Sequence, residues 1–396
     1  MISSGSRRNG MYPYPHLSFL LMATTWLAAA IPAGAQQPAA TPPAPSWMDK
    51  LDFSGDLRLR HESSWNLPST PSSRHRERVR GRFGVIYHAT EELSVEARLR
   101  TGDPDNPQNP YVDLGGSGSA EAFDSFTVSF DRLNARYATE SWWGAGGKFA
   151  HPFWSNPLYG ELVWDADVNP DGFAAGASSK DTFLDQLTLA AGEYVILEQA
   201  AGEDAFATVA QLSASEALGQ NSKLSGAVGY YHYYDATPGG ATAIVAGENS
   251  GNATNGAGTD FLSNFGVLNP ILAFTIGSAA HPITVSGEYI KNLRAEISED
   301  QGYALGVAYG STKAAGDWQA YYQWQLVEQD AVFTAFNGDD FTMQTNFLGH
   351  ILSWTYMFEN NIGLRLWSLI AKPDMVPAGG SDEYQYRFRV DFTITF

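Results

Sequence analysis

The 396-residue sequence contains no cysteine, which excludes disulfide scaffolds and cysteine-based metal sites. Lys and Arg together number 24 against 43 Asp and Glu, and the resulting net charge of -19 argues against a nucleic-acid partner. After Ile31 no apolar run approaches the roughly 18 residues of a membrane-spanning helix. A chain of this length fits either two soluble domains or one barrel of many strands.

The N-terminus has the pattern of an export signal. Two arginines, Arg7 and Arg8, precede an apolar run over residues 17–31, which ends in the small-residue sequence Ala33-Gly34-Ala35. Residues 1–35 are therefore predicted to be a cleaved signal peptide, a retained helix being the alternative. Residues 36–50, rich in Pro and Ala at their start, are predicted to be a periplasmic linker. An exported chain without another long apolar run can span a membrane only as a barrel.

The last thirteen residues, Tyr384 to Phe396, alternate strictly between apolar and polar. One face carries Tyr384, Tyr386, Phe388, Val390, Phe392, Ile394 and Phe396, and the other Gln385, Arg387, Arg389, Asp391, Thr393 and Thr395. A lipid-facing strand of an outer-membrane barrel needs about 9 to 11 residues of this kind. The segment is predicted to close such a barrel, and its terminal Phe396 to be a signal for the barrel-assembly machinery.

Similar alternation recurs along the chain from Leu51 onward. The predicted strands are 51–62, 74–88, 91–101, 125–138, 142–150, 171–177, 182–192, 204–215, 222–235, 268–278, 281–292, 300–311, 316–329, 344–358, 361–371 and 384–396. The fold class is therefore all-β, an antiparallel transmembrane β-barrel of about sixteen strands over residues 51–396.

Connection lengths alternate along this series. Every second connection is short, as at His88–Glu91 and Glu359–Asn360, whereas the others include long stretches such as Gly102–Asp124 and Ala236–Phe261. Short periplasmic turns and long extracellular loops are typical of outer-membrane barrels, and a soluble sandwich has no reason to alternate this way.

Twelve of the fifteen arginines after residue 35 fall on the predicted lumen face of five adjacent strands. They are Arg58, Arg60, Arg76, Arg78, Arg80, Arg82, Arg98, Arg100, Arg132, Arg136, Arg387 and Arg389. An arginine on the lipid face near the midplane would cost roughly 2–4 kcal/mol, which fixes this orientation. We expect a basic pore wall. The alternative is that a wet lumen tolerates the arginines, paired locally with Asp56, Glu62 and Glu96.

The connection from Ala150 to Asp171 carries the acids Glu161, Asp165, Asp167 and Asp171. If it folds into the lumen, these carboxylates face the arginines across a constriction, whose transverse field orients polar solutes. Residues 167–172 also match the first half of a calcium loop, but Ser178 replaces the expected glutamate, which favours a structural turn. No metal, cofactor or catalytic motif is present, so no enzymatic activity is expected.

Five segments in this order resemble the bacterial putative porin family: FSGDLRLRHE (53–62), RERVRGRFG (76–84), ARLRTG (97–102), GKFAHPFW (147–154) and VWDADVNPDGFA (163–174). The resemblance extends to the C-terminal YRFRVDFTITF. It implies an outer-membrane barrel that passes small solutes by diffusion. The arrangement is also similar to that of general porins, in which the third loop narrows the pore against a basic wall.

The sequence thus predicts a passive outer-membrane channel for small hydrophilic solutes and ions in a Gram-negative cell, surrounded by lipid and with no nucleic-acid partner. Assembly as a homotrimer and as a monomer are both left open. The nearest alternative is a substrate-specific channel or an exporter of anionic polysaccharide. A barrel enzyme is a more distant alternative, because no Ser-His pair or rim cluster of acids can be assembled. A secreted β-sandwich or adhesin is a third alternative, which extraction into aqueous buffer without detergent would favour.

Overall fold

The computed structural model describes residues 47–115, 123–180, 184–200, 203–236, 249–376 and 380–396. The predicted signal peptide and the linker up to residue 46 lie outside them. The chain divides into two units, Met1–Asp49 and Lys50–Phe396. A 3-10 turn, η1 (Met48–Lys50), precedes the first strand. Among the described residues, no helix has the length and apolar character required to cross a membrane.

The second unit is built from β-strands. Their bounds are β1 (Leu51–Trp65), β2 (Arg74–His88), β3 (Leu93–Thr101), β4 (Val112–Asp113), β5 (Val128–Ala138), β6 (Trp142–Lys148), β7 (Asp171–Lys180), β8 (Gln186–Leu197), β9 (Ala205–Ala217), β10 (Ser222–Tyr234), β11 (Gly266–Gly277), β12 (Pro282–Asn292), β13 (Gln301–Gly310), β14 (Trp318–Val327), β15 (Phe347–Glu359), β16 (Ile362–Pro373) and β17 (Gln385–Thr395). All sixteen predicted strands are present, and β4 is an additional short strand within the connection predicted over Gly102–Asp124.

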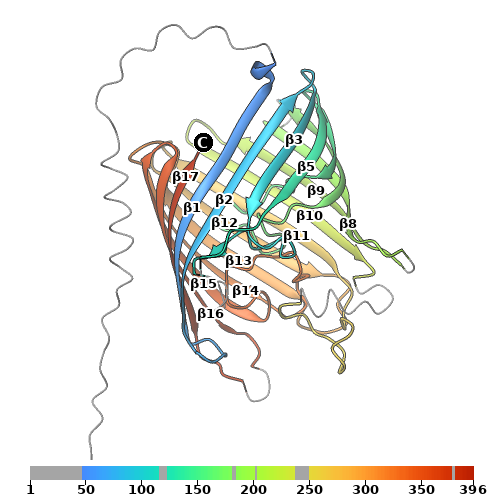
Figure 1. The fold of residues 1–396 in the computed structure, drawn as a ribbon, viewed down its shortest axis with the longest axis vertical. Helices are drawn as coiled ribbons and strands as arrows, with labels where there is room; N and C mark the ends of the chain where they lie inside the picture. The colour runs from blue at the N-terminus through green and yellow to red at the C-terminus, as the bar shows by residue number, and fades with distance from the viewer. Residues whose placement is uncertain (1–46, 116–122, 181–183, 201–202, 237–248, 377–379) are drawn as a thin grey trace, which may run out of the picture. The chain divides into compact units, whose positions relative to one another are not determined.

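The strands close into one antiparallel barrel (Figure 1). Each long strand pairs with the next, and β17 returns to pair with β1 from Asp56↔Thr395 to Trp65↔Tyr386. At the chain end, Gly55 and Phe396 exchange two backbone hydrogen bonds, of 2.9 and 3.0 Å. The predicted role of the C-terminal segment as the closing strand is thereby confirmed.

Most predicted strands differ from the observed ones by a few residues at one or both ends, and two of these differences have a clear cause. The strand predicted over 182–192 runs from Gln186 to Leu197, because Asp185 ends the turn by bonding β9 through the Ala217 N–H and the Glu216 carboxylate. The strand predicted over 171–177 continues to Lys180, since its last residues pair with β8.

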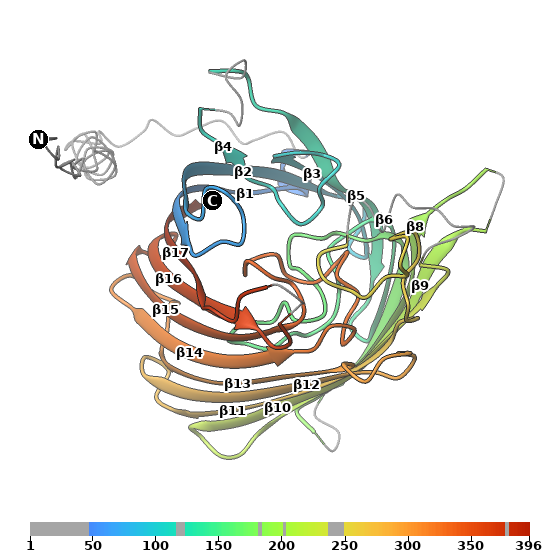
Figure 2. The same cartoon turned by 90° about the horizontal axis from the view of Figure 1, so that it is seen from below.

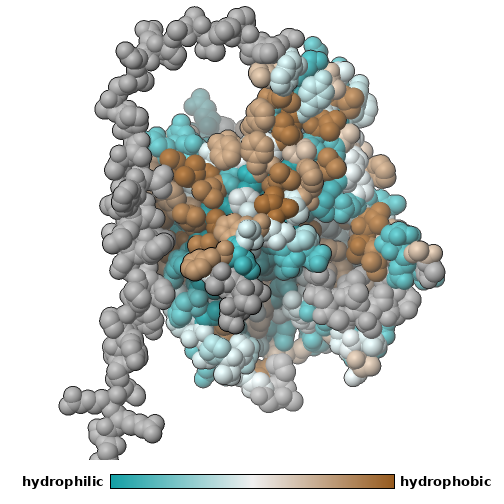
Figure 3. Space-filling model, in the orientation of Figure 1, coloured by the Kyte–Doolittle hydropathy of each residue, from teal (hydrophilic) through white to brown (hydrophobic). Residues whose placement is uncertain are grey.

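The outer face of the barrel is apolar. On β13 the exposed outward residues are Tyr303, Leu305, Val307 and Tyr309, and the buried inward ones are Gly302, Ala304, Gly306, Ala308 and Gly310. Exposed apolar side chains gather over the strands in Figure 3. This period of two is what a strand between lipid and lumen requires.

The connections also follow the predicted alternation, with tight turns such as residues 89–92 at one end and long loops at the other. The loops considered below are loop 2 (described at 102–115 and 123–127), loop 3 (149–170), loop 5 (described at 235–236 and 249–265) and loop 7 (328–346). Segments of these loops lie inside the ring of strands in Figure 2.

Part of the barrel interior is filled by an apolar core. Loop 3 contributes Leu162, Val163 and Trp164, and loop 7 contributes Val332 and Phe333. The wall beneath them has small or apolar inward residues, among them Ala205, Ala207, Val209, Val267, Ile290 and Ala304. Small residues permit this packing: a Cβ at Gly306 would lie 2.6 Å from Leu158 Cδ2. The lumen is therefore polar on only part of its circumference, which the sequence did not predict.

Candidate functional site: an arginine-lined cavity

The polar part of the lumen contains a cavity of about 390 Å³ between the strand wall and the inserted loops. Its charged lining consists of Arg58, Arg60, Arg78, Arg80, Arg82, Arg98, Arg132, Arg365 and Arg389 from the strands, with Glu161, Asp165, Asp167, Asp339 and Asp340 from the loops. Tyr111, Gln108, Asn109 and Trp367 complete the polar and aromatic contacts. The arrangement places cations on the wall and carboxylates on the loops.

Eight of the twelve predicted wall arginines line this cavity, and four do not. Arg76 contacts Glu62 and Asp113. Arg100 donates to the carbonyl oxygens of Asp103, Asn106 and Pro107. Arg136 lies 4.4 Å from the Trp143 ring centroid, and Arg387 binds loop 7 carbonyls. Arg365 on β16 lines the cavity but was not among the predicted residues.

Arginines stand directly opposite one another on neighbouring strands, as in the pairs Arg58↔Arg80 and Arg60↔Arg78. Like charges in this position destabilise a sheet unless anions separate them. Asp56 supplies such an anion, accepting from Arg80 Nη2 at 2.9 Å and Arg82 Nε at 2.5 Å.

Two further wall carboxylates neutralise this region. Asp391 takes two hydrogen bonds from Arg60, at 2.7 and 2.9 Å. Glu62, 1% exposed, accepts from Arg389 Nε at 2.7 Å and contacts Arg76 and Arg78. Local pairing with Asp56 and Glu62, the alternative raised from the sequence, therefore occurs, and Glu96 likewise contacts Arg132 at 3.2 Å.

Loop 2 places an aromatic ring against the arginines. β4 pairs with β2 through Arg78↔Asp113, in the region that lies beyond the end of β3. This pairing brings in Tyr111, whose ring centroid is 4.1 Å from the Arg60 guanidinium carbon. Its hydroxyl accepts a hydrogen bond from Arg58 Nη1 at 3.0 Å. The sequence prediction missed Tyr111, because nothing local marks a loop tyrosine as inward.

Loop 3 folds into the lumen, and three of its four predicted acids line the cavity. Asp167 Oδ1 lies 2.9 Å from Arg82 Nη1 and 3.5 Å from Arg80 Nη1. Asp171 does not join this group. Asp171 is the first residue of β7 and lies on the same outward face of the strand as Phe173. Its side chain is therefore exposed, and it forms an ion pair with Lys148 at 2.8 Å.

Loop 7 supplies two acids that sequence reasoning missed, Asp339 and Asp340. Asp340 accepts a hydrogen bond from Arg389, and its backbone oxygen accepts from Arg387 Nη1 at 2.6 Å. Loop 7 also contacts loop 3 by hydrogen bonds from Asp165 N to Phe336 O and from Gly338 N to Glu161 O. In the sequence, two adjacent acids follow Asn337-Gly338, but this pattern alone does not distinguish a loop that faces the lumen from one that faces solvent.

The loop carboxylates differ in their electrostatic surroundings. Burial and neighbouring carboxylates raise the pKa values of Glu161 and Asp165 well above their usual range. Burial and the Asp340 carboxylate likewise raise the pKa of Asp339. Although burial opposes it, attraction to Arg389 and Arg60 lowers the pKa of Asp340.

The calcium-loop match at residues 167–172 has its side-chain oxygens engaged by protein cations. Asp167 contacts Arg82, Asn169 Oδ1 accepts from Arg132 Nε at 2.8 Å, and Asp171 contacts Lys148. Over the described parts of the chain, no group of three or more His, Asp or Glu side chains is arranged to hold a metal ion.

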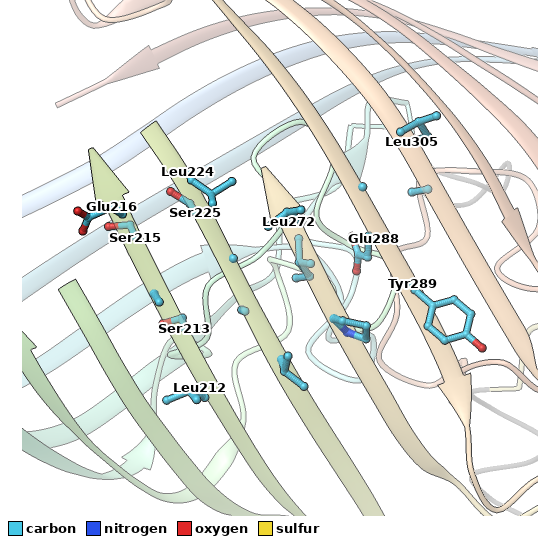
Figure 4. Close-up of a pocket in the computed structure, with 18 of the residues that line it drawn as sticks. Leu212, Ser213, Ser215, Glu216, Leu224, Ser225, Leu272, Glu288, Tyr289 and Leu305 are labelled. Atoms are coloured by element: carbon cyan, nitrogen blue, oxygen red, sulfur yellow. The ribbon is translucent and has the colours of Figure 1, made fainter. Parts of the chain in front are cut away.

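A larger hollow of about 840 Å³ lies across β9–β13 (Figure 4). Its lining includes Leu212, Leu224, Leu272 and Leu305, which are exposed on the outer face. It is thus a groove in the apolar outer face and shares no lining residue with the arginine cavity.

A family model described as Putative porin matches residues 63–263 and 275–375. The chain belongs to this family. This porin barrel is similar to three solved porins: Pseudomonas putida OprB (TM-score 0.56, 12% identity, covering 88% of this chain and 95% of that one), Salmonella typhi OmpF (0.51, 12%, 87% and 97%) and Vibrio cholerae OmpT with loop L8 deleted (0.51, 13%, 87% and 99%). No curated protein matches the chain. Family and fold indicate an outer-membrane channel rather than an enzyme.

Proposed function

We propose that the protein is a passive diffusion channel for small hydrophilic solutes and ions, and that these pass through the arginine-lined cavity. One observation carries the proposal: guanidinium groups of the barrel wall and carboxylates of loops 3 and 7 line the same cavity of about 390 Å³. Fixed charges of opposite sign across a narrow passage orient dipolar solutes and disfavour bulky apolar ones.

The nearest rival is a substrate-specific channel or an exporter of anionic polysaccharide. An arginine-rich wall favours a polyanion, but five carboxylates line the same cavity and loops 3 and 7 fill part of the lumen. Most wall arginines are also paired with Asp56, Glu62, Asp131 or Asp391. These contacts favour small solutes of mixed charge over a polyanion.

Planar-bilayer recording of the purified protein tests the proposal. We expect current that varies linearly with voltage and with salt concentration over a wide range. A closed channel, or strong saturation by one solute, would contradict general diffusion and support the substrate-specific alternative.

Export through the signal peptide, assembly and partners form part of the same proposal. We propose that residues 1–35 are cleaved and that β17, with the exposed Phe396 directly after it, is recognised by the barrel-assembly machinery. Phe396 lies 6.5 Å from the Phe83 ring on the outer face, where such a signal is accessible. Crosslinking of the purified protein in detergent decides between monomer and homotrimer.

A further inference from the structure

Two of the cavity arginines keep unused hydrogen-bonding capacity. Arg58 donates from Nε to Thr393 and from Nη1 to Tyr111, both at 3.0 Å, and Arg365 donates from Nε to Ser353 and from Nη2 to Tyr321. Within the described residues, Arg58 Nη2 and Arg365 Nη1 donate to no partner. The other arginines of the cavity each contact a carboxylate within 3.5 Å.

The surroundings of these two arginines leave them short of anions. Among the residues that the structure describes, the carboxylate oxygen closest to Arg58 is Asp391 Oδ2 at 4.0 Å, and this atom already accepts a hydrogen bond from Arg60. Arg365 has no carboxylate within 4.0 Å among the described residues, and its guanidinium carbon lies 3.2 Å from the Trp367 ring centroid. Arg58 is on β1 and Arg365 on β16, the two strands that flank β17, and both residues line the cavity. The unused N–H groups of Arg58 Nη2 and Arg365 Nη1 are suited to bind an anion that enters it.

On the loop side of the cavity, three of the five carboxylates that the structure describes lack a cation. Among the ion pairs within 4.0 Å in the described structure, none includes Glu161, Asp165 or Asp339, whereas Asp167 and Asp340 each have an arginine. Asp165 is 3% exposed, and within the described part of the chain its carboxylate accepts one hydrogen bond, from the Asp167 N–H at 2.7 Å. A buried carboxylate that lacks a cation is stabilised when a cation binds beside it.

We propose that the cavity selects dipolar solutes of the amino-acid class, with the solute carboxylate at Arg58 and Arg365 and its ammonium group at Glu161, Asp165 and Asp339. The inference rests on the proposed channel function and names its preferred solute class. A solute with only one charge satisfies one side and leaves the other unpaired. A volume of about 390 Å³ lies within the range of small-molecule sites.

L-alanine and lactamide provide a matched pair of probes, because they are structural isomers and only alanine is a zwitterion. Proteoliposome swelling measures the uptake of each at low concentration. We expect alanine to enter about fivefold faster than lactamide, a difference equivalent to about 1 kcal/mol. The Arg365→Gln and Asp165→Asn variants should each bring this ratio close to one by slowing the uptake of alanine.

Arg136→Gln is the control, since Arg136 faces the lumen interior but lies outside the cavity, and it should keep the wild-type ratio. Lactamide uptake reports that each variant is folded and open. Equal uptake of both isomers by the wild-type protein, or an unchanged ratio in both cavity variants, overturns the inference and leaves the channel function intact. Uptake of neither isomer overturns the channel function itself.

Discussion

Arg82 on β2 and Asp167 in loop 3 lie 2.9 Å apart, Nη1 to Oδ1, and join the barrel wall to the inserted loop. The same Asp167 oxygen is 3.5 Å from Arg80, so one carboxylate of the loop partly neutralises two arginines of the wall. The contact explains why a loop rich in acids is held against a row of arginines.

The first prediction concerns this carboxylate. Asp167→Asn removes one negative charge from the cavity and should raise the preference for chloride over potassium roughly fourfold, because a charge about 10 Å from a passing ion in water changes the energies of the two ions by about 0.4 kcal/mol each in opposite directions. Reversal potentials in a KCl gradient measure the change. Asp171→Asn is the control, because Asp171 is on the outer phase of β7, and it should leave the reversal potential unchanged.

The second prediction concerns the wall. Replacing Arg78, Arg80 and Arg82 together by alanine should shift selectivity towards cations, because Asp56 and Asp113 lose their closest counter-charges. The same reversal-potential measurement applies. Unchanged selectivity would remove these three residues from the ion pathway.

The third prediction concerns Tyr111, which lies over Arg60 and reaches Arg58. Tyr111→Ala removes a ring from the cavity wall and should increase single-channel conductance. Tyr111→Phe keeps the ring and loses only the hydroxyl contact with Arg58, so its conductance should stay near the wild-type value. Equal conductance of the alanine variant and the wild-type protein would place the ring outside the pathway.

The fourth prediction concerns stability. Glu62→Gln removes the most deeply buried counter-charge of Arg76 and Arg389, which keep only Asp113 and Asp340, and should lower the free energy of unfolding by about 3–5 kcal/mol. Urea unfolding in detergent measures the loss. Asp52→Asn, which disrupts an exposed pair with His88, should change stability by no more than about 1 kcal/mol. Equal effects of the two substitutions would contradict the assignment of Glu62 as a buried counter-charge.

The fifth prediction follows from the raised pKa values of Glu161, Asp165 and Asp339. As pH falls through these raised values the loops lose negative charge, so anion preference should increase at a pH above the usual carboxyl pKa of about 4. At a pH between the unfolded-state and folded-state pKa values, these carboxyl groups are protonated in the folded protein and ionised in the unfolded chain. Their contribution to stability is therefore greatest at low pH and is lost as pH rises through the folded-state pKa values.

Reversal potentials recorded across a pH series test this behaviour. The double variant Glu161→Gln with Asp165→Asn should flatten the response. A wild-type transition confined to pH values below about 4 would show that these carboxyls titrate normally.

The strands could be predicted from the sequence because lipid on one face and the aqueous lumen on the other require apolar and polar residues to alternate. Arg389 and Val390 follow that rule within a single strand. The sequence was not sufficient for the loops, whose positions depend on contacts between distant segments. Trp164 of loop 3 stacks on Phe336 of loop 7 at 5.3 Å, and no local pattern encodes that contact.

The same limit explains the errors at individual acids. Asp171 and Asp167 differ by four positions, but one begins a strand on its outer phase and the other precedes it inside the lumen. Asp339 and Asp340 acquire their place because Arg387 and Arg389 bind loop 7 beside β17 and because loop 3 bonds to the same loop at Gly338.

The central claim, that solutes pass between loop 3 and the arginine wall, is tested most directly by single-cysteine modification, since the chain has no cysteine of its own. Ala166 lines the cavity, and Leu212 lies on the outer face. Attaching a charged methanethiosulfonate reagent to an Ala166→Cys variant in a planar bilayer should produce stepwise loss of current, and the same treatment of Leu212→Cys should not. Unchanged current after modification at residue 166 would contradict the account.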